Sequence, residues 1–327
     1  MPSSPALTEK DLPSLNGRVY LVTGGYAGIG YELAKILYSA GGMVWIAGRS
    51  RDKAEAAIEA MMENNDTSNH SGEQADARNA PGEVKFLHLD LADLSTIKGA
   101  AQELLSNSSR LDIVWHNAAV MVPPDDTPAT PQGHDIQLAT NVLGPFLLQH
   151  FLNPLTLSTA ARSDVKKNDV RVIWLTSNAH TGAPKPDGVD WDNIELTGHT
   201  GFIGRLKKYS QSKAMNNILA YEFARRYGDK GIASLSVHPG ALSSGLQKDL
   251  PWLIDKIFSL RRQPPKFGAY SELFAGFVDV EPEKNGGFVA PFGTWGECDP
   301  AIKEGMEKQG TGKRLWELLE SEFKEWI

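Results

Sequence analysis

The sequence has few of the features that would place it outside a reducing, aqueous compartment. Its 327 residues include one cysteine, Cys298, so no disulfide can form within the chain and no cluster of thiolates can hold a metal ion. No stretch approaches eighteen consecutive apolar residues, and the opening segment MPSSPALTEKDLPSLNG lacks the apolar core of a secretion signal. We therefore predict a cytoplasmic protein with no integral membrane segment.

The sequence also has fewer positive than negative charges. The chain has 33 lysines and arginines against 40 aspartates and glutamates, a net charge of −7 and a pI near 5.7. This balance argues against nucleic acid or an anionic membrane surface as a partner. The hydrophobic fraction of 41% and the charged fraction of 22% are typical of a globular protein with a substantial core, and the length suits one large α/β domain.

Short apolar segments alternate along the chain with longer amphipathic ones. The short segments are rich in β-branched and aromatic residues, and most are separated by stretches with helical periodicity, such as 29–42 and 52–62. Strands that are apolar on both faces and separated by helices are typical of a parallel sheet covered on both sides. The pattern predicts a single doubly wound α/β sheet of the Rossmann type, with strands at 18–24, 43–48, 84–90, 111–118, 170–177 and 232–240.

We expect one domain over residues 17–327, preceded by a polar leader at 1–16. Residues 63–83 are polar and nearly free of large apolar side chains, which predicts a surface insertion. Residues 181–206 contain two prolines, five glycines and several apolar side chains, which we interpret as a loop that covers a substrate or as an excursion remote from it. Residues 245–327 would form a substrate-binding and packing region.

The last fifteen residues contain an apolar stripe at helical spacing, formed by Leu315, Leu318, Leu319 and Phe323. The stripe predicts a helix packed on its own domain. A dimer or membrane contact is the alternative for such a face.

The segment TGGYAGIG, residues 23–30, joins the first predicted strand to the first predicted helix. Glycines at 24, 28 and 30 allow positive φ angles and a close approach of the backbone, and the free amides of the helix start can bind a pyrophosphate. Many strand-to-helix turns contain glycine, but this position inside the first βαβ unit favours a dinucleotide.

The end of the second strand, AGRSR at 47–51, indicates which dinucleotide. A carboxylate at this point would bind the ribose hydroxyls of NAD, whereas this chain has Gly48 followed by Arg49 and Arg51. A guanidinium suits the additional phosphate of NADP, so we predict NADP, with two solvated arginines as the alternative.

Two polar residues follow the next strands. Asp90 could accept a hydrogen bond from an adenine amino group or cap the following helix. Asn117 could clamp the backbone near the cofactor or be an ordinary turn residue.

Tyr209 and Lys213 lie four positions apart in the segment YSQSK and therefore project from one face of a helix. A fixed ammonium near a phenol lowers the pKa of the phenol, which brings it into a range useful for proton transfer. An exposed tyrosine–lysine pair is the common alternative.

The order of these motifs carries a family resemblance. GRVYLVTGGYAGIG, HNAAVMVPP, NVLGPFLL, TSNAH, YSQSKAMN and HPGALSSGL follow one another between about residue 17 and residue 245. Together they resemble the short-chain dehydrogenase/reductase family, and in particular its retinol-dehydrogenase-like branch and the fungal relatives of that branch. The tail NGGFVAPFG…LWELLESEF also resembles fungal members.

The resemblance implies a role for each matching residue. Tyr209 would be the general acid in carbonyl reduction, Lys213 would lower its pKa and hold the nicotinamide ribose, and Ser177 would donate a hydrogen bond to the substrate oxygen. Asn141 would hold a water linked to Lys213. The positions that would contact the cofactor are Gly24, Tyr26, Gly28, Ile29, Gly30, Arg49, Asp90, Leu91, Asn117, Ala118, Tyr209, Lys213, Pro239, Leu242 and Ser244.

The chain departs from the family pattern at three points. His116 replaces the first Asn of an Asn-Asn-Ala-Gly turn, and Ala119 replaces its Gly, which requires a negative φ. Ser177 and Tyr209 are 32 positions apart, more than is usual. His180 and His238 have no carboxylate or cysteine at ligand spacing, so we interpret them as loop histidines and predict no metal site.

These observations predict an NADP-dependent oxidoreductase that reduces a hydrophobic or aromatic ketone or aldehyde to its alcohol, as a carbonyl reductase of fungal secondary metabolism. The alternatives are a catalytically silent NADP(H)-binding sensor or scaffold and, within enzymes, a sugar-nucleotide epimerase or dehydratase. The resemblance also implies a possible homodimer, unless the long C-terminal region blocks the usual helix-pairing surface.

Overall fold

A single mixed sheet organises the part of the chain that the computed structural model describes, namely residues 4–68, 80–242, 256 and 262–327. Its strand order is β3-β2-β1-β4-β5-β6-β7-β8, and every neighbouring pair is parallel except the β7–β8 hairpin. The strands are β1 (Val19–Thr23), β2 (Met43–Gly48), β3 (Glu83–His88), β4 (Ile113–His116), β5 (Val170–Leu175), β6 (Ile232–Val237), β7 (Phe288–Ala290) and β8 (Thr294–Gly296).

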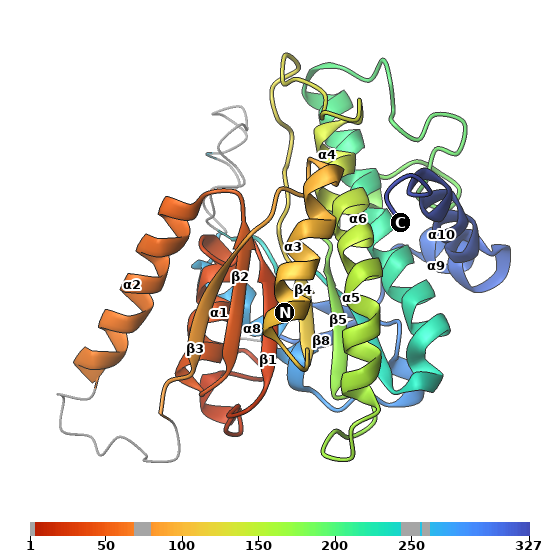
Figure 1. The fold of residues 1–327 in the computed structure, drawn as a ribbon. Helices are drawn as coiled ribbons and strands as arrows, with labels where there is room; N and C mark the ends of the chain where they lie inside the picture. The colour runs from red at the N-terminus through yellow and green to blue at the C-terminus, as the bar shows by residue number, and fades with distance from the viewer. Residues whose placement is uncertain (1–3, 69–79, 243–255, 257–261) are drawn as a thin grey trace.

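Helices cover both faces of this sheet (Figure 1). Helices α3, α5 and α6 lie across the face turned to the viewer, and α1 packs with α8 behind it. The helices are α1 (Gly28–Ser39), α2 (Arg51–Ser68), α3 (Leu94–Asn107), α4 (Ile136–Leu138), α5 (Gly144–Ala160), α6 (Gly201–Tyr227), α8 (Pro265–Phe277), α9 (Pro300–Glu304) and α10 (Thr311–Glu322). In the described residues, no helix is long and apolar enough to cross a membrane.

This architecture confirms the predicted doubly wound α/β fold. Each of the six predicted strands is present, with ends that differ from the prediction by at most three residues. The physical basis is plain in β1, β5 and β6, where every residue is buried, as expected for strands covered on both faces. The β7–β8 hairpin was not predicted, because three-residue strands carry too little periodicity to be recognised.

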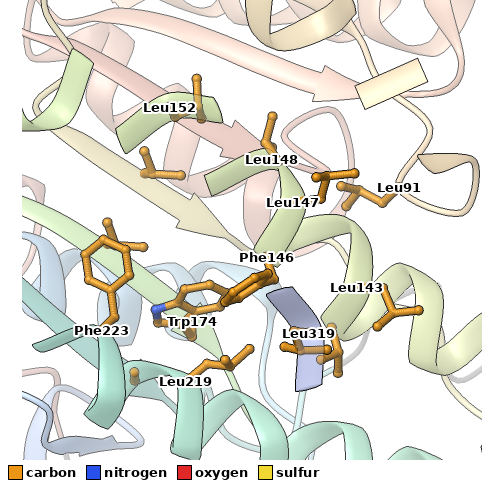
Figure 2. Close-up of a cluster of buried hydrophobic side chains, with 14 of the residues drawn as sticks. Leu91, Leu143, Phe146, Leu147, Leu148, Leu152, Trp174, Leu219, Phe223 and Leu319 are labelled. Carbon is orange, nitrogen blue, oxygen red and sulfur yellow. The ribbon is translucent and has the colours of Figure 1, made fainter. Parts of the chain in front are cut away.

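The apolar stripe at the C-terminus lies against its own domain. Helix α10 buries Leu315 and Leu319 and partly buries Leu318, and Phe323 at its C-terminal end is fully buried. The ring of Phe323 stacks on Phe146 of α5 with centroids 5.7 Å apart. Figure 2 shows Leu319 beside Trp174 and Phe146 in the core between the sheet and helices α5 and α6. The stripe is therefore core rather than a dimer or membrane surface.

The predicted N-terminal leader is instead part of the domain. Leu15 is 2% exposed, and the main-chain nitrogen of Ala6 donates to the carbonyl oxygen of Phe292 at 2.9 Å. Glu9 pairs with Lys266 of α8 at 2.9 Å. Leu7, Leu12 and Leu15 pack in or against one hydrophobic cluster of the domain, although three apolar residues in a polar segment are hard to distinguish from a linker in the sequence.

The predicted insertion at 63–83 is also shorter than expected. Helix α2 continues to Ser68 and β3 begins at Glu83, so both ends of the segment belong to regular elements, and residues 69–79 lie outside the described residues. Extension of a helix already nucleated by its amphipathic part requires little intrinsic propensity, which explains the polar continuation.

Most of the predicted substrate loop at 181–206 packs on the body of the domain. Trp191 and Ile194 lie against the hydrophobic core, and Leu196 is fully buried. Glu195 accepts hydrogen bonds from the ring of His134 and from the main-chain nitrogen of Asp135, both at 2.8 Å. These contacts hold residues 183–200 on the domain, and α6 already begins at Gly201, earlier than the tyrosine motif suggested. Whether the segment covers a substrate stays a prediction.

Candidate active site

The glycine turn between β1 and α1 has the backbone geometry expected of a phosphate-binding loop. Gly24 and Gly28 have φ angles of 69° and 56°, in the left-handed region that favours glycine. A Cβ atom on Gly30 would lie 2.5 Å from the side-chain nitrogen of Asn117, so this position has no room for a side chain. The side chain of Ala27 caps none of the first amides of α1, which leaves these donors available to an anionic ligand.

Asn117 clamps this turn to the end of β4. Its side-chain nitrogen donates to the carbonyl oxygen of Thr23 at 2.7 Å, and the hydroxyl of Thr23 accepts from the main-chain nitrogen of Ala118 at 2.9 Å. Of the two interpretations of Asn117, the backbone clamp therefore holds. The carboxyl ends of β1 and β4 are fixed next to each other where a dinucleotide would lie.

The end of β2 offers no carboxylate to a ribose. A Cβ atom on Gly48 would lie 2.3 Å from the ring of Tyr26, so the tyrosine packs directly on the glycine backbone. Arg49 is exposed and makes no ion pair with any described residue. Arg51 lies over the ring of Phe86, 5.1 Å from its centroid. The two arginines therefore differ, since only Arg49 is uncommitted.

Asp90 and Leu91 follow β3 at the same edge of the sheet. The carboxylate of Asp90 accepts from the main-chain nitrogen of Ala92 at 2.9 Å, within its own turn. Helix α3 is capped by Asp93, which accepts from the main chain of Ser95, so the capping interpretation of Asp90 is wrong and its adenine contact stays a prediction. Leu91 is 5% exposed and belongs to the core, which leaves only its main chain for a cofactor contact.

Three of the four predicted catalytic side chains, those of Ser177, Tyr209 and Lys213, meet at the carboxyl end of β5. Tyr209 and Lys213 lie on one face of α6 and are 4% and 1% exposed. The ammonium of Lys213 donates to the carbonyl oxygen of Leu175 at 2.9 Å and lies 5.6 Å from the centroid of the Tyr209 ring. Ser177, two residues beyond β5, reaches the phenol of Tyr209 with its hydroxyl.

The pKa of Tyr209 differs from the expectation. Burial raises it to about 12, and the hydrogen bond with the Ser177 side chain, rather than the charge of Lys213, counteracts the rise. The physical reason is that Lys213 is itself buried, which lowers its own pKa and weakens the charge that it can present. Tyr209 therefore keeps its proton throughout the neutral pH range.

A buried carboxyl group faces this lysine from the opposite side of the sheet. Glu272 of α8 is 0% exposed, and neither of its carboxyl oxygens has a hydrogen-bond partner among the described residues. Burial raises the pKa of Glu272 and lowers that of Lys213, and the charge of each group counteracts the shift of the other. The sequence does not reveal this residue, because Glu272 stands in an otherwise ordinary helix.

Asn141 lies in a single π-helical turn, Ala139–Leu143, between α4 and α5. Its side chain exchanges hydrogen bonds with the main chain of Val120 at 2.8 and 2.9 Å and donates to the hydroxyl of Ser212 at 3.0 Å. These bonds occupy both hydrogens of the side-chain nitrogen, and the role of Asn141 in holding a water stays a prediction. The side chain itself joins α6 to the segment after β4.

The segment after β6 approaches the glycine turn. Pro239 is buried and Leu242 is 4% exposed. A Cβ atom on Gly268 would lie 2.2 Å from Leu242 and 3.1 Å from Ile29 of α1, which places these side chains around the same glycine. Ser244, the last predicted cofactor contact, lies outside the described residues.

The two departures in the turn after β4 have separate explanations. Ala119 does not have a positive φ, so its methyl group is tolerated. His116 is 3% exposed, stacks on Trp174 with centroids 4.5 Å apart, and bonds to Gln149 through Nε2 at 3.1 Å. Its ring therefore belongs to the core, and burial lowers its pKa to about 4.

The burial of His116 predicts a loss of stability at acidic pH. Between pH 6.5 and pH 4, His116 is protonated in the unfolded chain but neutral in the folded chain, because burial lowers its pKa to about 4. The free energy of unfolding should therefore decrease as the pH falls from about 6.5 towards 4. Between pH 7.5 and pH 5.0, His116 should contribute about 2 kcal/mol to this loss. Urea unfolding of the wild type and His116→Asn at both pH values measures the difference. Equal losses in the two proteins would contradict the prediction.

Sequence reasoning missed several polar residues that support the site. The hydroxyl of Thr176 donates to the carbonyl oxygen of Lys213 at 2.7 Å, and the amide of Asn216 donates to the carbonyl oxygen of Leu175 at 2.9 Å. Asn216 lies inside the quoted YSQSKAMN segment, one turn after the lysine, which is the only indication of its role that the sequence contains. His180, interpreted as a loop histidine, is 2% exposed.

A glycine turn at the first strand of a parallel sheet, beside a buried tyrosine and lysine and a half-buried serine, defines a dinucleotide-binding protein of the α/β class. Residues 18–180 match the family model described as short chain dehydrogenase. A short-chain dehydrogenase/reductase of Phomopsis amygdali is 36% identical over 100% of this chain and 95% of the relative. The Emericella nidulans short-chain dehydrogenase/reductase pkfC is 33% identical over 99% and 98%.

The chain therefore belongs to the short-chain dehydrogenase/reductase family of oxidoreductases, which use a nicotinamide dinucleotide. Among solved structures, an uncharacterised protein from Mycobacterium Paratuberculosis is similar over 96% of each chain, with a TM-score of 0.67 and 27% identity. The Pseudomonas aeruginosa RhlG/NADP active-site complex is similar over 86% of this chain and 96% of that chain, with a TM-score of 0.62. Its 22% identity supports the fold alone.

Proposed function

We propose that this protein is an NADPH-dependent carbonyl reductase that converts a hydrophobic ketone or aldehyde to its alcohol. The observation that carries the proposal is the cluster of the buried Tyr209 and Lys213 with the half-buried Ser177, in which the phenol retains its proton at neutral pH. A protonated phenol suits the donor that a carbonyl oxygen needs on reduction. The fungal relatives are named as short-chain dehydrogenases/reductases, which supports an oxidoreductase, and a role in secondary metabolism is part of the proposal.

The chemistry divides between the cofactor and the chain. The bound nicotinamide would supply the hydride that adds to the carbonyl carbon. Tyr209 would donate its proton to the carbonyl oxygen, and the hydroxyl of Ser177 would donate a hydrogen bond that stabilises the negative charge developing there. Lys213, held on the carbonyl oxygen of Leu175, would orient the cofactor ribose.

A titration tests this function directly. Purified protein is mixed with NADPH or NADH, then with a panel of hydrophobic ketones and aldehydes, while nicotinamide absorbance is followed. We expect NADPH binding and oxidation that depends on the carbonyl compound. Binding without net NADPH loss on any carbonyl would instead favour a sensor or an epimerase, and absence of binding of either nucleotide would refute the nucleotide assignment.

The preference for NADP rests on the end of β2. Gly48 leaves no carboxylate for a ribose hydroxyl and no unfavourable charge for a phosphate, and the exposed Arg49 is free of ion pairs with the described residues. A guanidinium in this position can bind a phosphate through two charge-assisted hydrogen bonds.

Replacement of Arg49 by alanine should lower kcat/KM for NADPH by about 10- to 100-fold, since hydrogen bonds to charged groups contribute about 1.5–3 kcal/mol. The value for NADH should change less than about twofold, because NADH lacks the phosphate. Arg51→Ala is the matched control, because Arg51 already pairs with Glu55 at 3.6 Å and lies over the ring of Phe86. Unchanged discrimination in Arg49→Ala would place the phosphate elsewhere.

The substrate class is supported by the surface that leads to Tyr209. Ile203 is 82% exposed and Leu206 is 36% exposed on the first two turns of α6, in the part of the chain that the structure describes. Leu206 is three residues from Ile203 and three from Tyr209, so these side chains form a row along the helix. An apolar row that ends at the proton donor favours an apolar substrate over a sugar.

Self-association of this protein is also a proposal. A possible homodimer is implied by the family, but the faces of α5 and α6 that carry Phe146 and Phe223 are covered by Trp316 of α10. We therefore infer that any dimer forms through another surface, which light scattering of the full chain tests.

A further inference from the structure

His180 joins the candidate active site to the C-terminal part of the chain. It lies three residues after Ser177 in the short helix Asn178–Gly182 and is 2% exposed. Its Nδ1 atom is 2.6 Å from the carbonyl oxygen of Ser177, and its Nε2 atom is 3.0 Å from the main-chain nitrogen of Asp299. One imidazole thus bonds to two backbone groups that are 122 positions apart in the sequence.

The chemistry of these two partners specifies the state of the ring. A carbonyl oxygen can only accept, so Nδ1 must carry a hydrogen, and a main-chain N–H can only donate, so Nε2 must have a free lone pair. Only the neutral imidazole with its proton on Nδ1 satisfies both contacts. Burial, which lowers the pKa of His180, favours the same neutral form.

Asp299 is in turn a rigid point of attachment. Its carboxylate caps α9 by accepting from the main chain of Ala301 at 2.9 Å and accepts from the ammonium of Lys185 at 2.9 and 3.0 Å. The ring of His180 also lies edge-on to Phe288 of β7, with centroids 5.6 Å apart. The contacts of His180 and Lys185 with Asp299 therefore converge on the start of α9.

Two further contacts hold the same segment farther along. The hydroxyl of Thr311 donates to Asp187 at 3.0 Å, and the guanidinium of Arg314 lies 4.1 Å from the centroid of the Trp191 ring. Residues 180–191, which directly follow Ser177, are thus fastened at four places to residues 299–314. None of these contacts is local in sequence, and His180 is the one nearest to the catalytic serine.

We propose that His180 is a positioning residue, which transmits the placement of the C-terminal segment at Asp299 to the backbone of Ser177 and so fixes the Ser177 hydroxyl relative to Tyr209. This inference rests on the proposed function, in which Ser177 bonds to the carbonyl oxygen of the substrate. A donor that stabilises developing charge must be held within a fraction of an ångström, and a shift of about 1 Å can cost a hundredfold in rate.

The two nitrogens can be tested separately by substitution. The amide nitrogen of asparagine can replace Nδ1, so His180→Asn should retain the bond to Ser177, whereas the side-chain oxygen of glutamine can replace Nε2, so His180→Gln should retain the bond to Asp299. His180→Leu retains neither. We expect kcat to fall about 10- to 100-fold in His180→Leu and by less in the two amide variants, with the Kd for NADPH within about twofold throughout.

The pH profile gives a second readout that simple packing would not change. Protonation of His180 at Nε2 places a hydrogen opposite the main-chain N–H of Asp299, so the hydrogen bond between them breaks. The kcat of the wild type should therefore decrease as the pH is lowered. The charged groups that face this ring are the carboxylate of Asp299 and the ammonium of Lys185, and the titratable group beside it is the imidazole of His238, whose pKa burial lowers to about 4. In His180→Asn the acidic fall should be weaker. Lys185→Ala leaves the imidazole bonds intact but removes a positive charge that lowers the pKa of His180, so in this variant the fall should begin at a higher pH than in the wild type.

The outcomes separate this inference from the proposed function. If Tyr209→Phe and Ser177→Ala both retain normal turnover, the proposed function fails and the role of His180 fails with it. If both lose turnover while the His180 variants keep kcat within about twofold and change only the melting temperature, His180 is structural and the inference alone is overturned. The inference is supported if kcat falls most in His180→Leu and less in His180→Asn and His180→Gln, with the Kd for NADPH unchanged. If His180→Leu does not fold, the two amide variants still test the inference.

Discussion

Replacement of Tyr209 by phenylalanine should lower kcat for the best carbonyl substrate by about a hundredfold or more. The change removes one hydroxyl group and leaves a ring of the same size in a site that is 4% exposed, so the fold should be preserved. The lost hydroxyl is the proposed proton donor, which is hydrogen-bonded to Ser177 and keeps its proton at neutral pH. Steady-state NADPH oxidation measures kcat, and fluorescence titration measures the Kd for NADPH, which should change less than about twofold.

A matched control comes from the same helix. Tyr221→Phe makes the identical change three turns later, at a half-buried position far from Ser177, and should leave both constants unaltered. Turnover of Tyr209→Phe close to that of Tyr221→Phe would remove Tyr209 from the mechanism. Loss of turnover together with loss of NADPH binding would mean that the tyrosine holds the cofactor rather than the substrate oxygen.

Truncation of Phe323 to alanine should lower the free energy of unfolding by about 3–5 kcal/mol. The side chain is fully buried against Phe146, and its removal leaves a cavity between α10 and α5. A loss of this size is a large fraction of the stability of a typical domain, about 5–15 kcal/mol. Urea unfolding followed by circular dichroism measures it.

The neighbouring position supplies the control. Lys324 is exposed, so Lys324→Ala should change stability by no more than about 0.5 kcal/mol. If Phe323→Ala were as mild as this control, the C-terminal stripe would not belong to the core, and the alternative of a contact with another molecule would return.

The sequence by itself determined the fold class and the identity of the central residues. Fully apolar strands separated by amphipathic helices require a covered parallel sheet, and the turn at Gly24 follows from local backbone chemistry. The four-residue spacing of Tyr209 and Lys213 places both on one helical face whatever surrounds them. Each of these properties depends on short-range periodicity or on the chemistry of a few consecutive residues.

Only the tertiary structure decided how these residues are tuned and held. The pKa of Tyr209 rises because packing buries the phenol, and this depth of burial cannot be derived from a polar stretch of helix. His180 became a link rather than a loop residue because β7, β8 and α9 bring Asp299 to its Nε2 atom across 119 positions. Hydrogen bonds and desolvation depend on distances between segments far apart in the chain, and those distances exist only once the sheet and its covering helices have packed.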